Sequence, residues 1–222
     1  MTNNNEILDL QKSLGETIAD LIKKSIWTQE YDLGERLLEK KQAEKFNVSR
    51  TTIREAFSSL ENQGLIINKA RKGTYVAHFT KRDLKELIEL RILIEQDAAL
   101  KALFSLDEND FKMLSDILEE MKTHIKKVNW YELFNLDLEF HNTIVNLCGN
   151  SRIVHIFELN QTQMRTYIGY LANYYTSPEE FYEEHLKLFH LLKTKNACAV
   201  AKGINEHIIY AEEKLLGNIT KN

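Results

Sequence analysis

Apolar residues recur at helical spacing between residues 48 and 60, and this pattern predicts a helix with one buried face. The residues on that face are Ile53, Ala56, Phe57 and Leu60. Ser49 stands just before the helix and has the side chain of a good N-cap. The polar first turn carries Arg50, Thr51 and Arg54, whose donors match guanine edges and phosphate oxygens. The stretch therefore has the properties of a helix that reads the DNA major groove.

Shorter patterns surround this helix. Residues 14–26 have apolar positions at helical spacing, and residues 40–45 predict a short helix that ends in a tight turn at Asn47. A helix, a short turn and a second helix together make a helix-turn-helix. Two β-branched runs, 65–67 and 74–76, flank a loop with three cations and a glycine, which predicts a hairpin. This hairpin would form a basic wing suited to contact with the DNA backbone or minor groove.

The pattern changes to long helical periods after residue 76. Residues 77–81 are expected to be a linker, and six helices should follow it. Their predicted ranges are 81–104, 107–127, 129–148, 151–174, 178–194 and 197–216. This region has no strand pattern, so it should form an antiparallel helical bundle. The predicted fold class is mainly α, with a winged helix-turn-helix domain over residues 1–76 and an all-α bundle over residues 82–222.

Two of the predicted helices begin at sequences that have the form of a capping box. These are Ser105-x-x-Glu108 and Ser177-x-x-Glu180. In such a motif the serine would cap the helix and the glutamate would bond back to the serine backbone. The motifs therefore predict where these two helices start.

Composition favours a cytoplasmic protein with folded domains. The chain has 222 residues, of which 43% are hydrophobic, which is enough for one large or two small domains. It lacks a bilayer-length apolar run, and its N-terminus lacks the pattern of a signal peptide. Two cysteines, Cys148 and Cys198, without a Cys-x-x-Cys motif indicate a reducing compartment and two buried thiols.

The net charge of −4 would not by itself suggest a DNA-binding protein, but the charges are segregated. Residues 36–54 contain six cations against two acidic residues, and the loop of the predicted hairpin adds three more cations. Acidic residues gather in the C-terminal part. A local basic face is what binding to phosphate requires, so the charge pattern is compatible with DNA binding.

Four metal-ligating side chains could meet inside the bundle. Asp137 and His141 are four residues apart, so both project from one face of their helix. His185 and His207 lie in the middle of the last two predicted helices, and antiparallel pairing would bring them to one level. Three imidazoles and one carboxylate suit a divalent transition metal with an open position for water or a ligand. The alternative is a set of hydrogen-bonded core histidines.

The other histidines are not assigned to this cluster. His190 lies five residues after His185 and should point elsewhere. For the remaining three a surface or core position is expected, because no partner can be placed beside them: His78, His124 and His155.

Four motifs mark the first third of the chain. They are Leu33-Gly34-Glu35-Arg36-Leu37, Val48-Ser49-Arg50-Thr51-Thr52-Ile53-Arg54-Glu55-Ala56, Leu60-Glu61-x-x-Gly64-Leu65-Ile66 and Gly73-Thr74-Tyr75-Val76. Together they resemble the winged helix of the GntR family of bacterial transcription regulators. The family usually has a proline where this chain has Leu33, so the turn at Gly34 should be less stiff.

This resemblance implies a set of DNA-contacting residues in the recognition helix, before it and in the wing. They are Arg36, Arg50, Thr51, Thr52, Arg54, Lys72 and Gly73, to which Ser49 at the start of the helix is added.

The second part of the chain resembles the FCD ligand-binding domain of the FadR subfamily. The matching residues are Leu90-Arg91-x-x-Ile94-Glu95-x-x-Ala98-Ala99, Asp137-x-x-x-His141, Glu184-His185 and His207. In metal-containing members, the aspartate and the three histidines bind zinc, nickel or a similar ion, and a small carboxylate effector binds at the metal. The resemblance thus implies a divalent metal at Asp137, His141, His185 and His207. Arg91 and Arg165 are the candidates to clamp the effector, although each could instead be an ion-pair partner, as Glu95 could be for Arg91.

The resulting hypothesis is a homodimeric, metabolite-responsive regulator, in the usual family mode a repressor, that binds double-stranded operator DNA with two-fold symmetry. The rival hypothesis is a metal-dependent hydrolase or oxygenase that acts on a small organic acid, with the N-terminal domain as a scaffold. No general base, nucleophile motif or phosphate loop accompanies the ligands, which favours the regulator. A third alternative is a metal-free helical domain that serves dimerisation alone.

Overall fold

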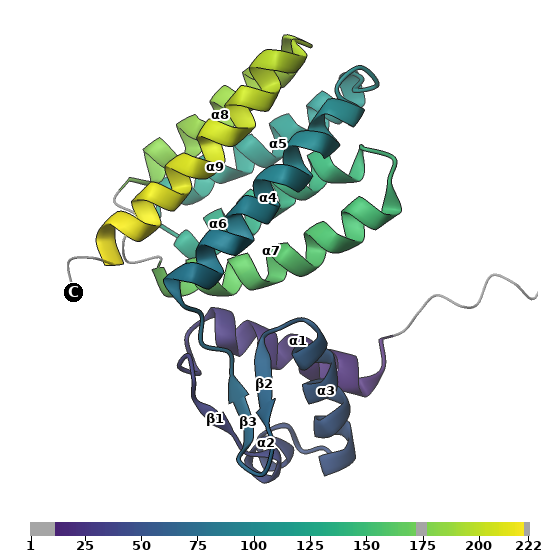
Figure 1. Ribbon diagram of the computed structural model, residues 1–222, viewed down its shortest axis with the longest axis vertical. Helices are drawn as coiled ribbons and strands as arrows, with labels where there is room; N and C mark the ends of the chain where they lie inside the picture. Colours follow the sequence, from purple (N-terminus) through teal and green to yellow (C-terminus); the bar gives the residue numbers. More distant parts are fainter. Residues whose placement is uncertain (1–11, 172–176, 220–222) are drawn as a thin grey trace, which may run out of the picture. The chain divides into compact units, whose positions relative to one another are not determined.

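The chain divides into two compact units, of which the first ends at His78 and the second begins at Phe79. The computed structural model describes the backbone of residues 12–171 and 177–219, and the side chains of residues 12–166 and 177–211. Figure 1 draws the first unit in purple to blue and the second in blue-green to yellow. The described residues are mainly helical, so the fold class predicted from the sequence is confirmed.

The first unit contains the predicted helix-turn-helix. Its helices are α1 (Leu14–Trp27), α2 (Glu39–Phe46) and α3 (Arg50–Asn62). Asn47 ends α2 with a φ of 52° and a ψ of 49°, the left-handed conformation that its side chain tolerates. The predicted apolar stripe of α3 is buried, and α3 packs against α1 and α2. Burial of this stripe leaves the polar first turn of α3 on the outside of the unit.

A three-stranded antiparallel sheet completes the first unit. Its strands are β1 (Arg36–Leu37), β2 (Ile66–Lys69) and β3 (Gly73–Val76), in the order β1-β3-β2. Lys69 pairs with Gly73 at the closed end of the β2–β3 hairpin, and Arg36 pairs with Tyr75 across β1 and β3. The hairpin was expected from the sequence and β1 was not, because two residues are too few to show an alternating pattern. The third strand matters because it fixes Arg36 beside the wing.

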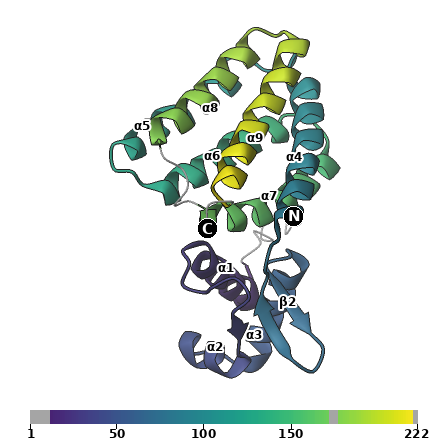
Figure 2. The ribbon, with the colours of Figure 1, turned by 60° about the vertical axis from the view of Figure 1, so that its left-hand side comes forward.

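The second unit is a bundle of six described helices, as predicted. They are α4 (Lys81–Ala102), α5 (Glu108–Ile125), α6 (Trp130–Asn146), α7 (Ser151–Leu171), α8 (Pro178–Lys193) and α9 (Ala197–Ile219). The last three residues of the helix predicted for 151–174 lie outside the described residues. Helix α4 packs against α6, α7 and α9, and α5 packs against α6 and α8. Figure 2 shows α8 and α9 side by side, and these two helices also contact each other.

The capping box predicted at Ser105 is wrong. Asp107 is the N-cap of α5, because its carboxylate accepts the N–H groups of Asn109 and Asp110 at 2.8 and 3.0 Å. In turn, the Asp110 carboxylate accepts the backbone N–H of Asp107 at 2.9 Å. Ser105 instead donates its hydroxyl to the carbonyl of Ala102 at 2.8 Å, and so belongs to the end of α4. A carboxylate in the first turn also interacts favourably with the helix dipole, which a serine does not.

The prediction at Ser177 is correct in its main feature. The Ser177 hydroxyl accepts the backbone N–H of Glu180 at 3.1 Å, and Pro178 occupies the first turn of α8. The same hydroxyl donates to the side chain of Glu179 at 3.2 Å. Helix α8 is thereby fixed at its start, seven residues before His185.

The prediction of two buried thiols is wrong. Cys148 is half-buried and Cys198 is exposed, and both are free. Cys198 lies in the first turn of α9, on a side that faces away from the core. Among the described residues, no helix combines the length and apolar character that crossing a bilayer requires.

Candidate nucleic-acid interface and metal centre

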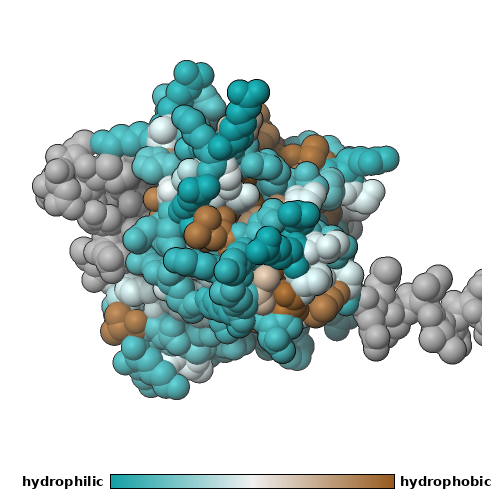
Figure 3. Space-filling model, turned by 90° about the horizontal axis from the view of Figure 1, so that it is seen from below, coloured by the Kyte–Doolittle hydropathy of each residue, from teal (hydrophilic) through white to brown (hydrophobic). Residues whose placement is uncertain are grey.

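The first turn of α3 presents polar groups to solvent. Ser49 caps the helix and accepts the backbone N–H of Thr52 at 3.1 Å, and the two hydroxyls lie 2.9 Å apart. Arg50 and Thr51 are exposed, and Thr52 is half-buried. Figure 3 views the molecule from the side on which α2 and the wing lie in Figure 1, and this face is mainly hydrophilic. The first turn of α3 is thus free to approach an anionic partner.

Arg54 has a partner within the same unit. Its Nε lies 2.9 and 3.1 Å from the two carboxylate oxygens of Glu39 on α2; the Arg54 side chain is exposed and Glu39 is half-buried. This ion pair and hydrogen bond raise the pKa of Arg54 above its ordinary value. Glu39 would therefore compete with an anionic partner for this guanidinium, a feature that spacing in the sequence did not reveal.

The wing holds its cations around Tyr75. The Arg36 guanidinium lies 6.0 Å and the Lys69 ammonium 4.8 Å from the centre of the Tyr75 ring. The Tyr75 hydroxyl donates to the carbonyl of Lys72 at 3.2 Å, which ties the ring to the turn. Gly73 has a φ of +103°, and a Cβ at this position would lie 3.1 Å from Arg36 Nη2. The predicted residues Arg36, Lys72 and Gly73 thus lie together at one end of the sheet.

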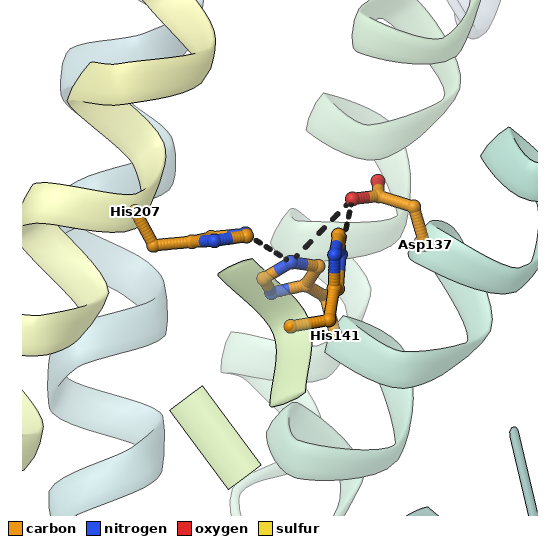
Figure 4. A group of neighbouring side chains, drawn as sticks. Asp137, His141 and His207 are labelled. Carbon is orange, nitrogen blue, oxygen red and sulfur yellow. Dashed lines mark hydrogen bonds and ion pairs between the residues drawn. The ribbon is translucent and has the colours of Figure 1, made fainter. Parts of the chain in front are cut away.

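The four predicted metal ligands converge inside the second unit. Asp137 and His141 come from α6, His185 from α8 and His207 from α9, and all four are buried. One candidate ligand atom from each residue lies within 4.8 Å of those from the other three. Figure 4 shows His207 reaching from its helix toward Asp137 and His141 on α6.

The distances in this cluster are close to those that a bound ion requires. His185 Nε2 lies 2.9 Å from Asp137 Oδ1, and His141 Nε2 lies 3.1 Å from His207 Nε2. The distance from His141 Nε2 to the same Asp137 oxygen is 3.7 Å. A tetrahedral ion bound at about 2.0–2.2 Å holds its ligands about 3.3–3.6 Å apart. Small shifts of the side chains would therefore admit a transition metal.

His185 shows why a cation suits the cluster. Its Nδ1 lies 2.7 Å from the carbonyl oxygen of Phe181, and its Nε2 lies 2.9 Å from Asp137 Oδ1. Both neighbours are acceptors, whereas a neutral imidazole has only one N–H to donate. Either a second proton on the ring or a cation between Nε2 and the carboxylate satisfies both contacts. A metal at Nε2 would leave the Nδ1 proton for Phe181, which is the usual arrangement of a histidine ligand.

The charges in and around the cluster favour a bound cation. Burial alone would raise the pKa of Asp137, but the hydrogen bond with His185, the nearby His141 ring and the Arg91 guanidinium hold it well below its usual range. Burial lowers the pKa of His207 well below its ordinary value, and the neighbouring His185 and His141 add to this effect. Asp137 is therefore anionic and His207 neutral, which are the forms that bind metals.

A buried ion pair on α4 adjoins the cluster. Glu95 Oε2 lies 2.6 Å from His141 Nδ1, in a contact bent away from ideal hydrogen-bond geometry, and Arg91 Nε donates to Glu95 Oε1. Burial would raise the pKa of Glu95, but the Arg91 guanidinium and the adjacent His141 ring lower it, so the carboxylate stays ionised. The sequence pointed to Glu95 only as a partner of Arg91. Its contact with His141 depends on how α4 and α6 pack, which spacing along one helix does not show.

A small cavity lies beside the cluster. Its walls are formed by Arg91, Phe134, Asp137, Phe181, Glu184, His185, His207, Tyr210 and Ala211. The cavity has a volume of about 20 Å³, which is room for about one or two waters. Tyr210 donates its hydroxyl to Glu180 at 3.0 Å, between α9 and α8. A ligand larger than a few atoms would need α8 and α9 to separate or these side chains to turn.

The two predicted effector arginines differ in their positions. Arg91 lines the cavity, and Arg165 is not among its lining residues. The Arg165 side chain is 1% exposed, stacks against the rings of Tyr131 and Phe134, and donates to Asn135 Oδ1 at 3.4 Å. Burial lowers the pKa of Arg165 to about 10, so it remains cationic at neutral pH. Arg91 is the better placed of the two to meet a ligand at the cluster.

The other histidines lie outside the cluster, as expected. His124 is half-buried. The other three are exposed: His78, His155 and His190. Glu184 and Tyr210 were not predicted as part of the site, and they line the cavity. Glu184 stands beside His185 in the motif that resembles the FCD domain, and this motif is the signal that could have found it.

Comparisons with known proteins agree with the two-part reading of the chain. Residues 14–76 match the model of the bacterial regulatory proteins of the gntR family, and residues 86–209 match the FCD domain. The HTH-type transcriptional regulator LutR of Bacillus subtilis is 28% identical over 200 residues, which cover 81% of this chain and 90% of LutR. The gluconate operon transcriptional repressor of Bacillus licheniformis is also 28% identical, over 88% of this chain and 82% of its own.

Solved structures show the same fold. The E. coli protein McbR/YncC superposes with a TM-score of 0.80 at 22% identity, covering 94% of this chain and 99% of its own. A transcriptional regulator from Rhodococcus sp. RHA1 superposes with a TM-score of 0.79 at 21% identity, covering 93% of this chain and 99% of its own.

Proposed function

The chain belongs to the GntR family of DNA-binding transcriptional regulators and carries an FCD domain, and from this premise we propose that it is a metal-dependent sensor of a small carboxylate. Membership in this family makes it a regulator and not an enzyme, so the hydrolase or oxygenase alternative is set aside. In the proposal, a homodimer places two copies of α3 in successive major grooves of a palindromic operator. The protein acts as a repressor in the cytoplasm.

The buried cluster of one carboxylate and three imidazoles carries the proposal, because its ligand atoms lie within 4.8 Å of one another. Asp137, His141, His185 and His207 would hold a divalent ion, with zinc or nickel best suited to three imidazoles. When bound, the ion would offer an open coordination position to a carboxylate oxygen. Arg91, on the wall of the adjoining cavity, would pair with the same carboxylate.

On the DNA side, the proposal assigns the exposed first turn of α3 to base readout. Arg50 would donate to a guanine edge, Ser49, Thr51 and Thr52 to bases or phosphates, and Arg36, Lys72 and Gly73 would place the wing on the backbone. Arg54 would join them after exchanging Glu39 for DNA. An effector can change operator affinity only as far as it binds the DNA-competent and incompetent forms differently.

Arg50→Ala tests the DNA-binding part of the proposal. Duplexes selected by the full-length protein from a random library would supply the probe, and fluorescence anisotropy would measure affinity for selected and scrambled sequences. Loss of a bidentate base contact should lower discrimination between the two by about 5- to 150-fold, equivalent to about 1–3 kcal/mol. Arg82→Ala is the matched control, because Arg82 is exposed on α4 and pairs with Glu86.

Two results would count against the proposal. Equal discrimination by wild type and Arg50→Ala would remove α3 from base readout. Absence of tightly bound metal in protein purified without chelators would remove the sensor, and would leave the alternative of a helical domain that serves dimerisation alone.

A further inference from the structure

Glu95 makes two contacts that the proposed function does not yet use. Its side chain is 3% exposed, in the middle of α4. One carboxylate oxygen lies 2.6 Å from His141 Nδ1, and the other accepts Arg91 Nε. The same carboxylate therefore touches a candidate metal ligand and the cation on the cavity wall.

The contact with His141 has a chemical consequence. An imidazole has two nitrogens, and an ionised carboxylate beside Nδ1 favours the form with its proton there. The lone pair is then on Nε2, which is the nitrogen that faces Asp137 and His207 at 3.7 and 3.1 Å. His141 is thus held in the form that can bind a metal through Nε2.

The three imidazoles of the cluster differ in this respect. His185 Nδ1 faces a backbone carbonyl, that of Phe181 at 2.7 Å. His207 Nδ1, like His141 Nδ1, is buried and makes no hydrogen bond of good geometry within the described part of the chain. Of the three rings, only that of His141 has its outer nitrogen beside a carboxylate in the described residues. Its orientation therefore depends on a charged side chain from another helix.

We propose that Glu95 is a positioning residue of the metal site, which holds His141 in its ligating form and makes α4 part of the site. This inference rests on the proposed metal-dependent function. Arg91 is one helical turn before Glu95, so an effector carboxylate that binds Arg91 would share this guanidinium with Glu95. Helix α4 begins at Lys81, shortly after β3 ends at Val76. The metal, through Glu95, and the effector, through Arg91, would thus both contact α4. Helix α4 is the helix that follows the wing along the chain.

Metal affinity is the direct test. Zinc(II) and cobalt(II) would be titrated into chelator-stripped, full-length wild type, Glu95→Gln and Glu95→Ala, with zinc affinity obtained by competition with a chromophoric chelator. Outer partners of metal-bound histidines contribute about 10- to 100-fold in affinity. Zinc Kd should therefore rise about tenfold in Glu95→Gln, and toward a hundredfold in Glu95→Ala. The cobalt absorption bands should shift, because the coordination geometry changes.

Two controls separate positioning from general loss of charge or stability. Glu89→Gln and Asp97→Asn remove one negative charge each from the same helix, where both side chains are exposed and pair with lysines. Neither should change zinc Kd or the cobalt spectrum. Circular dichroism of the metal-free variants would establish that α4 remains folded.

The tautomer of His141 gives a test that needs no variant. Long-range proton–nitrogen correlation spectra of the metal-free wild type should place the His141 proton on Nδ1. A proton on Nε2 alone would overturn the inference, as would a wild type that binds zinc tightly while Glu95→Gln binds it equally well. A wild type that binds no metal would instead remove the proposed sensor, and this inference with it.

Discussion

At the scale of single residues, the sequence identifies groups more readily than their partners. Spacing brought Asp137 and His141 to one helix face and predicted that His185 and His207 would meet them from the last two helices, and the four side chains do lie together. Spacing could not reveal that Glu39 pairs with Arg54, or that Glu95 contacts His141. Both partners come from a different helix, and contacts of that kind depend on packing.

Gly73→Ala offers a prediction at this scale. The substitution strains a backbone with a φ of +103° and places a Cβ 3.1 Å from the Arg36 guanidinium. Operator affinity should fall several-fold because Arg36 must move, and unfolding should become easier by about 1 kcal/mol or more. Thermal unfolding and anisotropy titrations measure the two effects.

Gly149→Ala is the matched control for Gly73→Ala. Gly149 has a φ of +71°, and an added Cβ would meet no heavy atom within 4 Å. The Gly149→Ala protein should lose stability through backbone strain and keep its operator affinity. Equal operator affinity in Gly73→Ala and wild type would show that Arg36 does not need its present position.

At the scale of helices and strands, periodicity predicted the six helices of the bundle, the helix-turn-helix and the hairpin. It failed at β1, which has two residues, and at the start of α5, where Asp107 caps the helix in place of Ser105. These failures have one cause. Short elements and helix ends depend on individual hydrogen bonds, which a repeating pattern does not report.

The contact between α8 and α9 leads to a second prediction. A Cβ on Gly203 would lie 2.3 Å from Leu191 Cδ1, and Gly203 is one helical turn before His207. Gly203→Leu should therefore push the two helices apart and destabilise the protein by about 1–3 kcal/mol. Because His185 and His207 lie on these helices, zinc affinity should fall as well.

Lys202→Leu provides the comparison for Gly203→Leu. Lys202 is the preceding residue, and its side chain is 74% exposed. The Lys202→Leu substitution places a leucine on the outer face of α9 and should leave zinc affinity unchanged. Similar zinc affinity in both variants would mean that close packing of α8 and α9 does not position the cluster.

At the scale of the whole molecule, one chain carries two kinds of site. The first unit presents a capped, cation-bearing helix and a basic wing, and the second encloses a cluster with the donor set of a transition-metal site. Composition indicated neither, since the net charge of −4 averages over an acidic bundle and a first unit of nearly balanced charge, whose cations gather between residues 36 and 72. The family resemblance predicted both the DNA-binding surface and the metal cluster, and the structure shows how close the four candidate ligands lie.

Metal removal should weaken the folded state of the whole chain. A ligand that binds only the folded protein stabilises it by about 4 kcal/mol when present at about 1,000 times its Kd. The thermal midpoint of the protein should therefore fall after chelation and return when zinc is added. In Asp137→Asn, added zinc should raise the midpoint much less, and an equal rise in both proteins would place the metal elsewhere.

The central claim is that the buried cluster controls DNA binding. Its most direct test is an anisotropy titration of a selected operator duplex with zinc-loaded wild type and His207→Ala, each with and without a panel of small mono- and dicarboxylic acids. We predict that at least one acid changes the operator affinity of the wild type by about 5- to 150-fold and leaves His207→Ala unaffected. An operator affinity that no acid changes, or that changes equally in both proteins, would contradict the account.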